Sequence, residues 1–359
     1  MKIAQVCYRY HPQIGGVGTV VKEISEGLAR KGLDVEVLTQ DRFGQYPATE
    51  SISGVTVRRF RTGPLGWDFP FPNTSLRNFL RRNSNEYDLI HAHNYHDFSP
   101  LYAAWAKGGN RLVLNPHYHG TGHNLLMNFL LGPYRHFGKA TFEKADYIIC
   151  VSEAEKHYVQ CHFDVPDERL AVIPNGVHCE RIAEAVPFPF DGKGLLCVGR
   201  LEKYKNIHLA IQALSCLSTE YKLTIIGSGP YGGKLAQLIE ELHVGDRVQI
   251  LSDLSTEQVY RWYKTCHLVL NLSSIEAFGM TVVEGLAAGK PVLVNNEMAL
   301  AELATRLEGV RAVDAEEMSP EQLADEIVQM LGIGREVPDL SEYTWDSIVE
   351  RVKALYHDL

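Results

Sequence analysis

A short apolar run, a polar loop, a helical segment and a second apolar run follow one another between residues 268 and 294. Leu268–Leu272 and Pro291–Val294 have the composition of buried strands, and one helix fits between them. Strands joined through a helix in this way lie parallel. The pattern therefore predicts an open α/β sheet, in which ligands bind at the carboxyl ends of the strands.

The same alternation continues along the whole chain and restarts after its middle. With 359 residues, of which 45% are hydrophobic, the chain can bury more than one core. A Pro- and Phe-rich stretch at 187–194 has the composition of a linker. We therefore expect two α/β domains, residues 1–184 and 190–343. Further strands are expected at 2–7, 34–38, 55–60, 88–93, 111–115, 146–151, 170–173, 195–198, 222–226 and 247–251.

The loop between the first two runs carries groups that suit a sugar attached to a diphosphate. The backbone N–H groups of Phe278, Gly279, Met280 and Thr281 are expected at a helix N-terminus, where a phosphate binds well, and Gly279 allows close approach. Carboxylates on either side accept hydrogen bonds from sugar and ribose hydroxyls. The alternative is that one of these carboxylates only interacts with the helix dipole and that the other belongs to a solvated helix residue. The two carboxylates are those of Glu276 and Glu284.

Two cations follow the strand expected at 195–198. Arg200 and Lys205 lie at its carboxyl end, where positive charge would meet a departing diphosphate. For either residue alone, an exposed surface charge is the plain alternative.

Histidines gather at the ends of the strands expected at 88–93 and 111–115. Alternating histidines on a strand share a face, which offers a metal site. No Asp, Glu or Cys stands at ligand spacing beside them, so we expect no metal here. The six histidines are His91, His93, His96, His117, His119 and His123.

A glycine cluster, Gly15-Gly16-Val17-Gly18, precedes a helix expected from about Thr19 to Lys31. A dinucleotide fingerprint has its glycines directly after the strand and includes a third glycine, which is missing here. The cluster therefore disfavours a nicotinamide-dependent oxidoreductase.

Charge and cysteine usage exclude other classes. The net charge is −9, and the residues after Val186 hold 15 Lys+Arg against 25 Asp+Glu, which argues against nucleic-acid binding. Seven cysteines without a CxxC pair fit reduced thiols. No apolar run approaches the ~18 residues of a membrane span, and the start does not have the pattern of a signal peptide. We therefore expect a cytoplasmic protein.

One helix, expected from about Ser75 to Asn83, carries Arg77, Arg81 and Arg82 on one face after a Pro/aromatic loop at 63–72. This edge could contact the inner face of a membrane or an anionic acceptor. A solvated face is the alternative that we favour.

The spacing of Glu276 and Glu284 matches the Glu-x7-Glu motif of retaining GT-B glycosyltransferases of the family-4 kind, also called glycosyl transferase group 1. Arg200 and Lys205 match that family's Gly-Arg-x4-Lys pattern, and the chain resembles these enzymes over essentially its whole length. It departs from them at Asn295, where the family commonly has a Gly-Gly turn shortly after the strand. The resemblance implies a GT-B fold, with two Rossmann-like domains facing across a cleft.

The resemblance also implies roles for the domains and for single residues. The N-terminal domain, with a terminal helix at 344–359 packed back on it, would carry the acceptor, and residues 190–343 would bind the nucleotide-sugar. Glu284 would bind ribose and Glu276 the sugar hydroxyls, while Arg200, Lys205 and the 278–281 amides would hold the diphosphate. His117, or its neighbour His119, would contact the donor sugar. Further donor contacts are implied for Gly15, Gly16, Asn175, Gly227 and Leu251.

The implied activity is retaining transfer of a hexose from a UDP- or GDP-linked donor to an acceptor hydroxyl in glycan biosynthesis. The acceptor would be a sugar or glycan, a small polyol or a lipid-linked sugar. We expect no cofactor and no divalent metal, because the chain has no Asp-x-Asp motif. A GT-B-fold sugar-nucleotide epimerase and a non-catalytic nucleotide-sugar binder are the alternatives.

Overall fold

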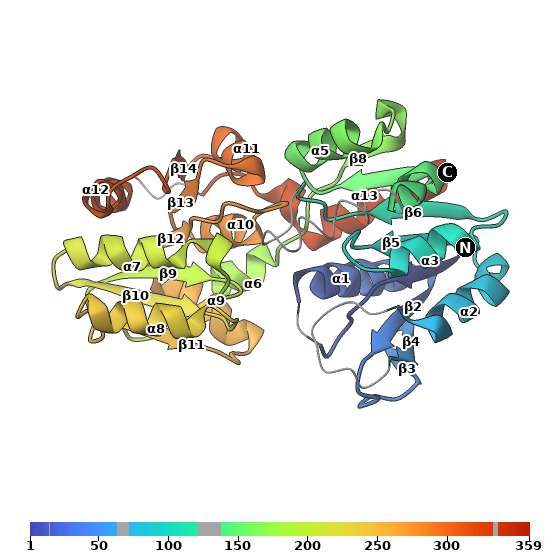
Figure 1. The fold of residues 1–359 in the computed structure, drawn as a ribbon, viewed down its shortest axis with the longest axis horizontal. Helices are drawn as coiled ribbons and strands as arrows, with labels where there is room; N and C mark the ends of the chain where they lie inside the picture. The colour runs from blue at the N-terminus through green and yellow to red at the C-terminus, as the bar shows by residue number, and fades with distance from the viewer. Residues whose placement is uncertain (14, 63–71, 121–137, 333–336) are drawn as a thin grey trace. The chain divides into compact units, whose positions relative to one another are not determined.

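The computed structural model of the protein describes residues 1–13, 15–62, 72–120, 138–332 and 337–359 (Figure 1). By its internal contacts the chain divides into two units. Unit 1 comprises Met1–Gly176 and Trp345–Leu359, and unit 2 comprises Val177–Thr344. Each unit has its own sheet and its own hydrophobic core, so the expected pair of α/β domains is confirmed.

Unit 1 contains an eight-stranded sheet in the order β3-β4-β2-β1-β5-β6-β7-β8. All neighbours pair in parallel except β3, which runs antiparallel to β4 at the edge. The strands are β1 (Lys2–Val6), β2 (Asp34–Asp41), β3 (Thr49–Ile52), β4 (Val55–Arg61), β5 (Leu89–His93), β6 (Arg111–Asn115), β7 (Tyr147–Cys150) and β8 (Leu170–Val172).

The α-helices of unit 1 cover this sheet, and the last of them comes from the C-terminal end of the chain. It packs against α1, which joins β1 to β2 (Figure 1). The helices are α1 (Gly16–Arg30), α2 (Thr74–Asn83), α3 (Ser99–Ala106), α5 (Glu153–Phe163) and α13 (Trp345–Asp358).

Unit 2 contains a six-stranded, wholly parallel sheet in the order β11-β10-β9-β12-β13-β14. The first three strands therefore grow the sheet in one direction and the next three in the other. The strands are β9 (Lys193–Val198), β10 (Tyr221–Ile226), β11 (Val248–Leu251), β12 (Leu268–Asn271), β13 (Val292–Asn295) and β14 (Val310–Val313).

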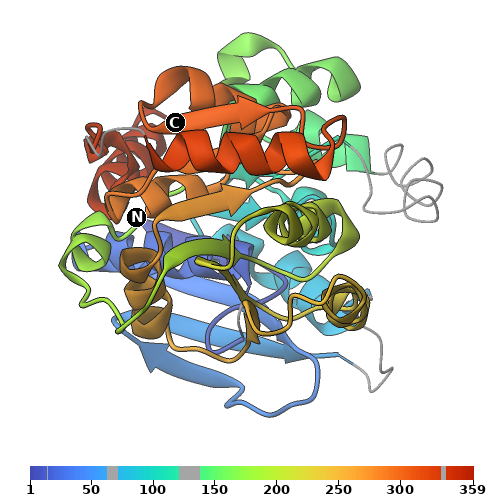
Figure 2. The same cartoon turned by 90° about the vertical axis from the view of Figure 1, so that its left-hand side faces the viewer.

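Right-handed crossovers in the two directions place helices on opposite faces of the unit 2 sheet (Figure 2). Helix α7 packs against α8 and α12, and α6 packs against α9 and α10. The helices are α6 (Cys179–Glu184), α7 (Ile207–Cys216), α8 (Gly232–Glu241), α9 (Thr256–Thr265), α10 (Met280–Ala287), α11 (Met298–Arg306) and α12 (Pro320–Leu331).

Local sequence signals explain several helix ends. Capping boxes start α9 at Ser255 and Gln258, and α12 at Ser319 and Gln322. Four 3₁₀ turns are described outside the α-helices: Ser84–Glu86, Asp167–Arg169, Lys203–Lys205 and Ser341–Tyr343.

Helix α1 begins three residues earlier than the sequence suggests, at Gly16 instead of Thr19. Its first turn packs against the preceding loop, since a Cβ at Gly18 would lie 3.2 Å from the carbonyl oxygen of Arg9. The glycines therefore open the helix and do not form a loop before it.

The predicted linker at 187–194 lies inside unit 2. Phe188 packs on the Trp262 ring at 5.0 Å between ring centroids, and its N–H donates to Thr265 Oγ1 at 2.8 Å. The chain instead passes between the units at 176/177 and 344/345. A hydrogen bond joins the two chain segments beside these passages, because Val177 N–H donates to the Tyr343 carbonyl at 2.7 Å.

The packing of α13 explains one glycine beside this passage. A Cβ at Gly176 would lie 2.5 Å from the ring of Trp345, the first residue of α13. Only a glycine lets the two chain segments of unit 1 meet here without displacing that ring.

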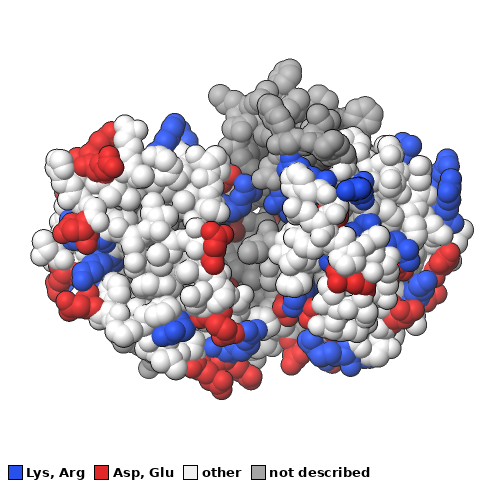
Figure 3. Space-filling view, turned by 90° about the horizontal axis from the view of Figure 1, so that it is seen from below, with Lys and Arg blue, Asp and Glu red and all other residues white. Residues whose placement is uncertain are grey.

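The surface and the cysteines agree with the expectations in part. All seven cysteines are unpaired. Both signs of charge are interspersed on the face shown in Figure 3. Within the described ranges, no helix is both long and apolar enough to cross a membrane. The arginines of α2 are exposed, whereas residues 63–71 of the loop before it lie outside the described residues.

Candidate active site

The strand order of unit 2 creates one place where neighbouring connections leave in opposite directions. This topological switch point lies between β9 and β12, whose carboxyl ends lie side by side in the sheet. The loop after β9 carries Arg200 and Lys205, and the loop after β12 carries Glu276. Ligands of open α/β sheets bind at such points. The fold therefore brings the two sequence motifs together.

The loop after β12 is fixed by its own serines and by the loop after β9. Ser274 N–H donates to the Tyr204 carbonyl at 2.9 Å, and the hydroxyl of Ser273 donates to the Ile275 carbonyl at 2.8 Å. Gly279 then caps α10 with a left-handed φ of 95°, and a Cβ there would lie 2.8 Å from Leu300. Helix α10 thus begins at Met280, which places the N–H groups of Met280 and Thr281 in its first turn.

An ion pair crosses between the two loops. Lys205 Nζ lies 2.5 Å from Glu276 Oε2, and both side chains are only about one-fifth exposed. Burial alone would lower the pKa of Lys205, but the Glu276 carboxylate raises it above its usual value. An ammonium charge is therefore held at the switch point.

Arg200 has a different setting. Its guanidinium is exposed and pairs with Glu202 Oε1 at 3.0 Å. It also repels the ammonium of Lys205, acting to lower the pKa of that group. The two cations predicted to meet a diphosphate are therefore near each other, but only Lys205 is bound to Glu276.

The strand ends beside Arg200 pack backbone against backbone. Gly227, after β10, has a φ of 148°, and a Cβ there would lie 1.9 Å from the Gly199 carbonyl oxygen. Gly227 N–H donates to the Leu251 carbonyl at 2.8 Å. Gly227 and Leu251, predicted as donor contacts, thus lie at the carboxyl ends of β10 and β11 on the same sheet edge.

Glu284 lies in the second turn of α10 and is held by a partner that the sequence did not suggest. Tyr263, a fully buried residue of α9, donates its hydroxyl to Glu284 Oε2 at 2.6 Å. The two residues are 21 positions apart and belong to no motif, so no spacing signal links them.

In unit 1, His117 follows β6 with a left-handed φ of 49°. Its side chain is buried, and burial lowers its pKa to about 4, so the imidazole is neutral at pH 7. Nε2 has no hydrogen-bond partner among the described residues. This nitrogen is itself buried, so the contact of His117 with the donor sugar stays a prediction.

A buried polar chain lies beneath His117. His93 stacks on His117 with ring centroids 6.2 Å apart, and its Nε2 bonds to Gln5 Oε1 at 2.7 Å. The Gln5 amide donates to the Tyr356 hydroxyl at 3.1 Å, which lies 2.6 Å from His91 Nδ1. The Gln5 amide oxygen only accepts, so His93 donates from Nε2. The Tyr356 hydroxyl accepts from Gln5 and therefore donates to His91 Nδ1, which leaves the proton of His91 on Nε2.

One ring nitrogen of each β5 histidine, His91 Nδ1 and His93 Nε2, is therefore bonded to a protein group. The other nitrogen of each ring is buried and has no hydrogen-bond partner among the described residues. Within the described part of the chain, no three His, Cys, Asp or Glu side chains are grouped to hold a metal ion. His123 lies outside the described residues.

Glu155 anchors the backbone next to His117. This buried carboxylate accepts the N–H groups of Tyr118 and Val151, while Ser152 caps the N-terminus of α5. His119, the neighbouring candidate, stacks on His96 with centroids 4.4 Å apart. No motif of the sequence indicates the role of Glu155, because its partners are backbone groups from two separate loops.

The other residues of unit 1 that were predicted to contact the donor are Gly15, Gly16 and Asn175. Gly15 is the N-cap of α1 and Gly16 its first residue, and a Cβ at either would meet no atom within 4 Å. Asn175 is buried just before the chain passes into unit 2.

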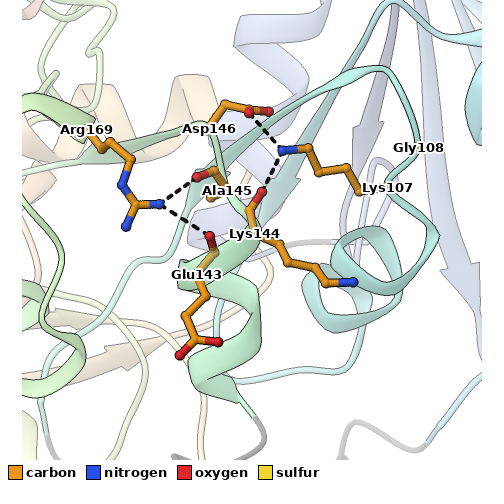
Figure 4. A pocket seen from close by; sticks show the side chains of 7 residues that line it. All are labelled: Lys107, Gly108, Glu143, Lys144, Ala145, Asp146 and Arg169. Atoms are coloured by element: carbon orange, nitrogen blue, oxygen red, sulfur yellow. Dashed lines mark hydrogen bonds and ion pairs between the residues drawn. The ribbon is translucent and has the colours of Figure 1, made fainter.

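A pocket of about 390 Å³ lies elsewhere. It is lined by residues that precede β6, β7 and β8, at the amino edge of the unit 1 sheet (Figure 4). Two of its cations are engaged within it: Lys107 pairs with Asp146 at 2.8 Å, and Arg169 donates to the Ala145 carbonyl at 3.0 Å. None of the residues predicted for the site lines this pocket.

Comparison with known proteins defines the class. The model of Glycosyltransferase Family 4 matches residues 14–181, and that of Glycosyl transferases group 1 matches residues 180–346. The chain belongs to this family of glycosyltransferases.

Relatives and solved structures agree with this assignment. A glycosyltransferase of Methanocaldococcus jannaschii is 28% identical over 99% of this chain and 98% of its own. The D-inositol 3-phosphate glycosyltransferase of Corynebacterium urealyticum is 26% identical over 100% and 96%. Sucrose-phosphate synthase from Thermosynechococcus elongatus superposes with a TM-score of 0.84, at 20% identity over 99% and 98%. Anabaena HepE with UDP and glucose gives 0.79, at 18% over 100% of both chains. The fold is GT-B.

Proposed function

We propose that this protein transfers a hexose from a nucleotide-sugar to an acceptor hydroxyl, with retention at the anomeric carbon and without a divalent metal. The observation that carries the proposal is the Lys205–Glu276 pair beside the N-terminus of α10, at the switch point of unit 2. A cation, a helix N-terminus and two carboxylates suit a diphosphate flanked by two sugars.

Each group has a role in this proposal. Glu284 accepts the ribose hydroxyls, and Glu276 accepts hydroxyls of the sugar. Lys205, Arg200 and the first amides of α10 hold the diphosphate and meet the charge that grows on it as the glycosidic bond breaks. Neutral His117 orients the donor sugar.

The proton and the stereochemistry follow from this placement. An oxygen of the departing phosphate takes the acceptor proton on the face where the new bond forms. The acceptor oxygen then replaces the phosphate on that face, so the configuration is retained without an enzymic nucleophile.

The donor is expected to carry UDP or GDP. Neighbours solved with UDP or UDP-glucose support a nucleotide-sugar, and relatives named for D-inositol 3-phosphate support a small polyol acceptor. Sugars and lipid-linked acceptors stay within the proposal, as do a cytoplasmic location and peripheral contact of α2 with an anionic membrane.

Turnover in EDTA is the direct test of the metal-independent mechanism. We expect donor-dependent release of nucleoside diphosphate to persist in excess EDTA and to fall on Lys205→Ala or Arg200→Ala. Loss in EDTA that Mg²⁺ or Mn²⁺ restores would contradict the proposal.

Product analysis separates the alternatives. Isomerisation of the donor sugar without an acceptor would indicate an epimerase. Tight donor binding without turnover, across an acceptor panel, would indicate a binding protein.

A further inference from the structure

Helix α9 places one hydroxyl against the carboxylate that is proposed to bind ribose. The Tyr263 ring is fully buried, and its oxygen lies 2.6 Å from Glu284 Oε2. A carboxylate only accepts, so the tyrosine is the donor, and the distance is typical of an O–H···O⁻ bond.

This bond limits what Glu284 can do. It occupies Oε2 and fixes the side-chain torsion, while the Glu284 side chain stays partly exposed. Oε1 is then the oxygen that remains for donors from a ligand. A phenylalanine would fill the same space in α9, so packing alone does not require the hydroxyl.

We propose that Tyr263 is a positioning residue that holds Glu284 in the ionised, ribose-accepting form. This inference rests on the proposed donor site and adds a residue that no motif of the chain indicates.

The surroundings of Glu284 explain why it needs such a partner. Burial raises the pKa of Glu284, while the hydrogen bond from Tyr263 and the nearby His178 lower it. Strands β12 and β13, which pack against α10, contribute no titratable side chain. Among the ionisable groups of α6, α9 and their ends, those that interact with the Glu284 carboxyl are His178, Cys179 and Tyr263, and Tyr260 lies near Tyr263. Arg181 of α6 pairs with Glu257 of α9.

The sign of the effect is definite. A ribose hydroxyl donates to the carboxylate, so binding weakens as the pH falls through the pKa of Glu284. Removal of the Tyr263 hydroxyl raises that pKa, which moves the loss of binding to higher pH.

The experiment is calorimetric titration with UDP-glucose between pH 5 and 8, because its diphosphate diester does not titrate in that range. For Tyr263→Phe we expect the Kd at pH 7 to rise roughly 3- to 10-fold. The pH at which log Kd begins to rise on acidification should move to a higher value. Tyr221→Phe is the matched control. Its hydroxyl contacts Lys193 at the amino end of β10, away from the carboxyl edge of the sheet, so this variant should bind as the wild type does.

Glu284→Gln keeps Tyr263 and its packing, so it tests the inference even if Tyr263→Phe folds poorly. In this variant the Kd for UDP-glucose should no longer depend on pH. Adding Tyr263→Phe to it should not change the pH profile further. Persistence of the pH dependence in Glu284→Gln, or a wild-type profile in Tyr263→Phe, would overturn the inference.

A different result would remove the donor site itself. If the wild type binds none of the UDP, GDP and ADP sugars, the proposed function fails. If it binds UDP-glucose and Tyr263→Phe is unchanged, only the role of Tyr263 fails.

Discussion

The two glutamates of the Glu-x7-Glu motif have different partners. Glu284 accepts a hydrogen bond from a buried hydroxyl, whereas Glu276 is paired with an ammonium group. In the proposed function the two glutamates contact two different parts of one ligand, so substitution of each predicts a different loss.

Glu284→Gln should weaken UDP binding with little effect on folding. Loss of a charge-assisted hydrogen bond costs about 1.5–3 kcal/mol, while the amide oxygen can still accept from Tyr263. Calorimetry with UDP measures this loss, and Glu220→Gln, an exposed residue paired with Lys193, is the control. Unchanged UDP affinity would remove the ribose role.

Glu276→Gln should lower kcat roughly 10- to 100-fold and leave UDP affinity the same or slightly higher. The sugar hydroxyls lose their acceptor, but Lys205 no longer has to leave an ion pair to meet the diphosphate. Steady-state kinetics beside UDP titration separates these effects. Near-normal turnover would be incompatible with the assignment.

At the scale of elements, the turn after β10 has a geometric requirement. Gly227→Ala would drive a Cβ to 1.9 Å from the Gly199 carbonyl oxygen, so β9 or β10 must shift. We expect unit 2 to lose about 1–3 kcal/mol of unfolding free energy, measured by urea denaturation.

Gly233→Ala is the matched control for this turn. Gly233 lies in α8 with nothing within 4 Å of an added Cβ, so alanine should stabilise the helix by about 0.4–1 kcal/mol. Equal effects of the two substitutions would contradict the proposed close packing.

The buried histidines of β5 and the loop after β6 predict a contribution to the stability of unit 1 that is lost in acid. Burial lowers the pKa of His91 to about 3, that of His117 to about 4, and that of His93 well below its usual value. The unfolded chain takes up protons near pH 6.5 and the folded chain does not. The histidine contribution is therefore lost as the pH falls below 6.5, by up to about 1.4 kcal/mol per pH unit and histidine. Burial raises the pKa of Glu155 to about 8 and that of Asp97 to about 7, and these two groups act in the opposite direction.

Hydrogen exchange at pH 7 and pH 5, corrected for intrinsic rates, tests this prediction. His91→Phe should reduce the loss of protection that unit 1 shows between pH 7 and pH 5. His357→Gln, on the exposed end of α13, should leave that loss as in the wild type. The same loss in His91→Phe as in the wild type would show that this histidine does not contribute to acid stability.

Many elements were predictable because apolar runs and caps are local signals. Strands such as Arg111–Asn115 appear where the sequence places them. Strand β3 was not predicted, since Thr49–Ile52 has little apolar character and pairs only at an edge. The motifs that carry Lys205 and Glu276 predicted that these two side chains lie at the same sheet edge, and they form an ion pair there. Tyr263, Glu155 and Gln5 could not be predicted, because their partners lie far away in sequence.

At the scale of the whole molecule, the chain has two sheets whose switch points bear different chemistry. In unit 2 the loops at the switch point carry Lys205 and Glu276, which suit a nucleotide-sugar. In unit 1 the strands beside the switch point carry His93 and Gln5, which lie beneath a neutral imidazole. The C-terminal helix completes unit 1, because Tyr356 supplies the hydroxyl that orders this buried chain.

Proton NMR of the reaction tests the central claim most directly. The protein is incubated in EDTA with UDP- and GDP-hexoses and a panel of sugar, polyol and lipid-linked acceptors, and the anomeric signals are followed from the first turnovers. We expect a new glycoside with the anomeric configuration of the donor, formed only when an acceptor is present. An inverted product would contradict retention. A donor that is isomerised, or never consumed, would contradict glycosyl transfer itself.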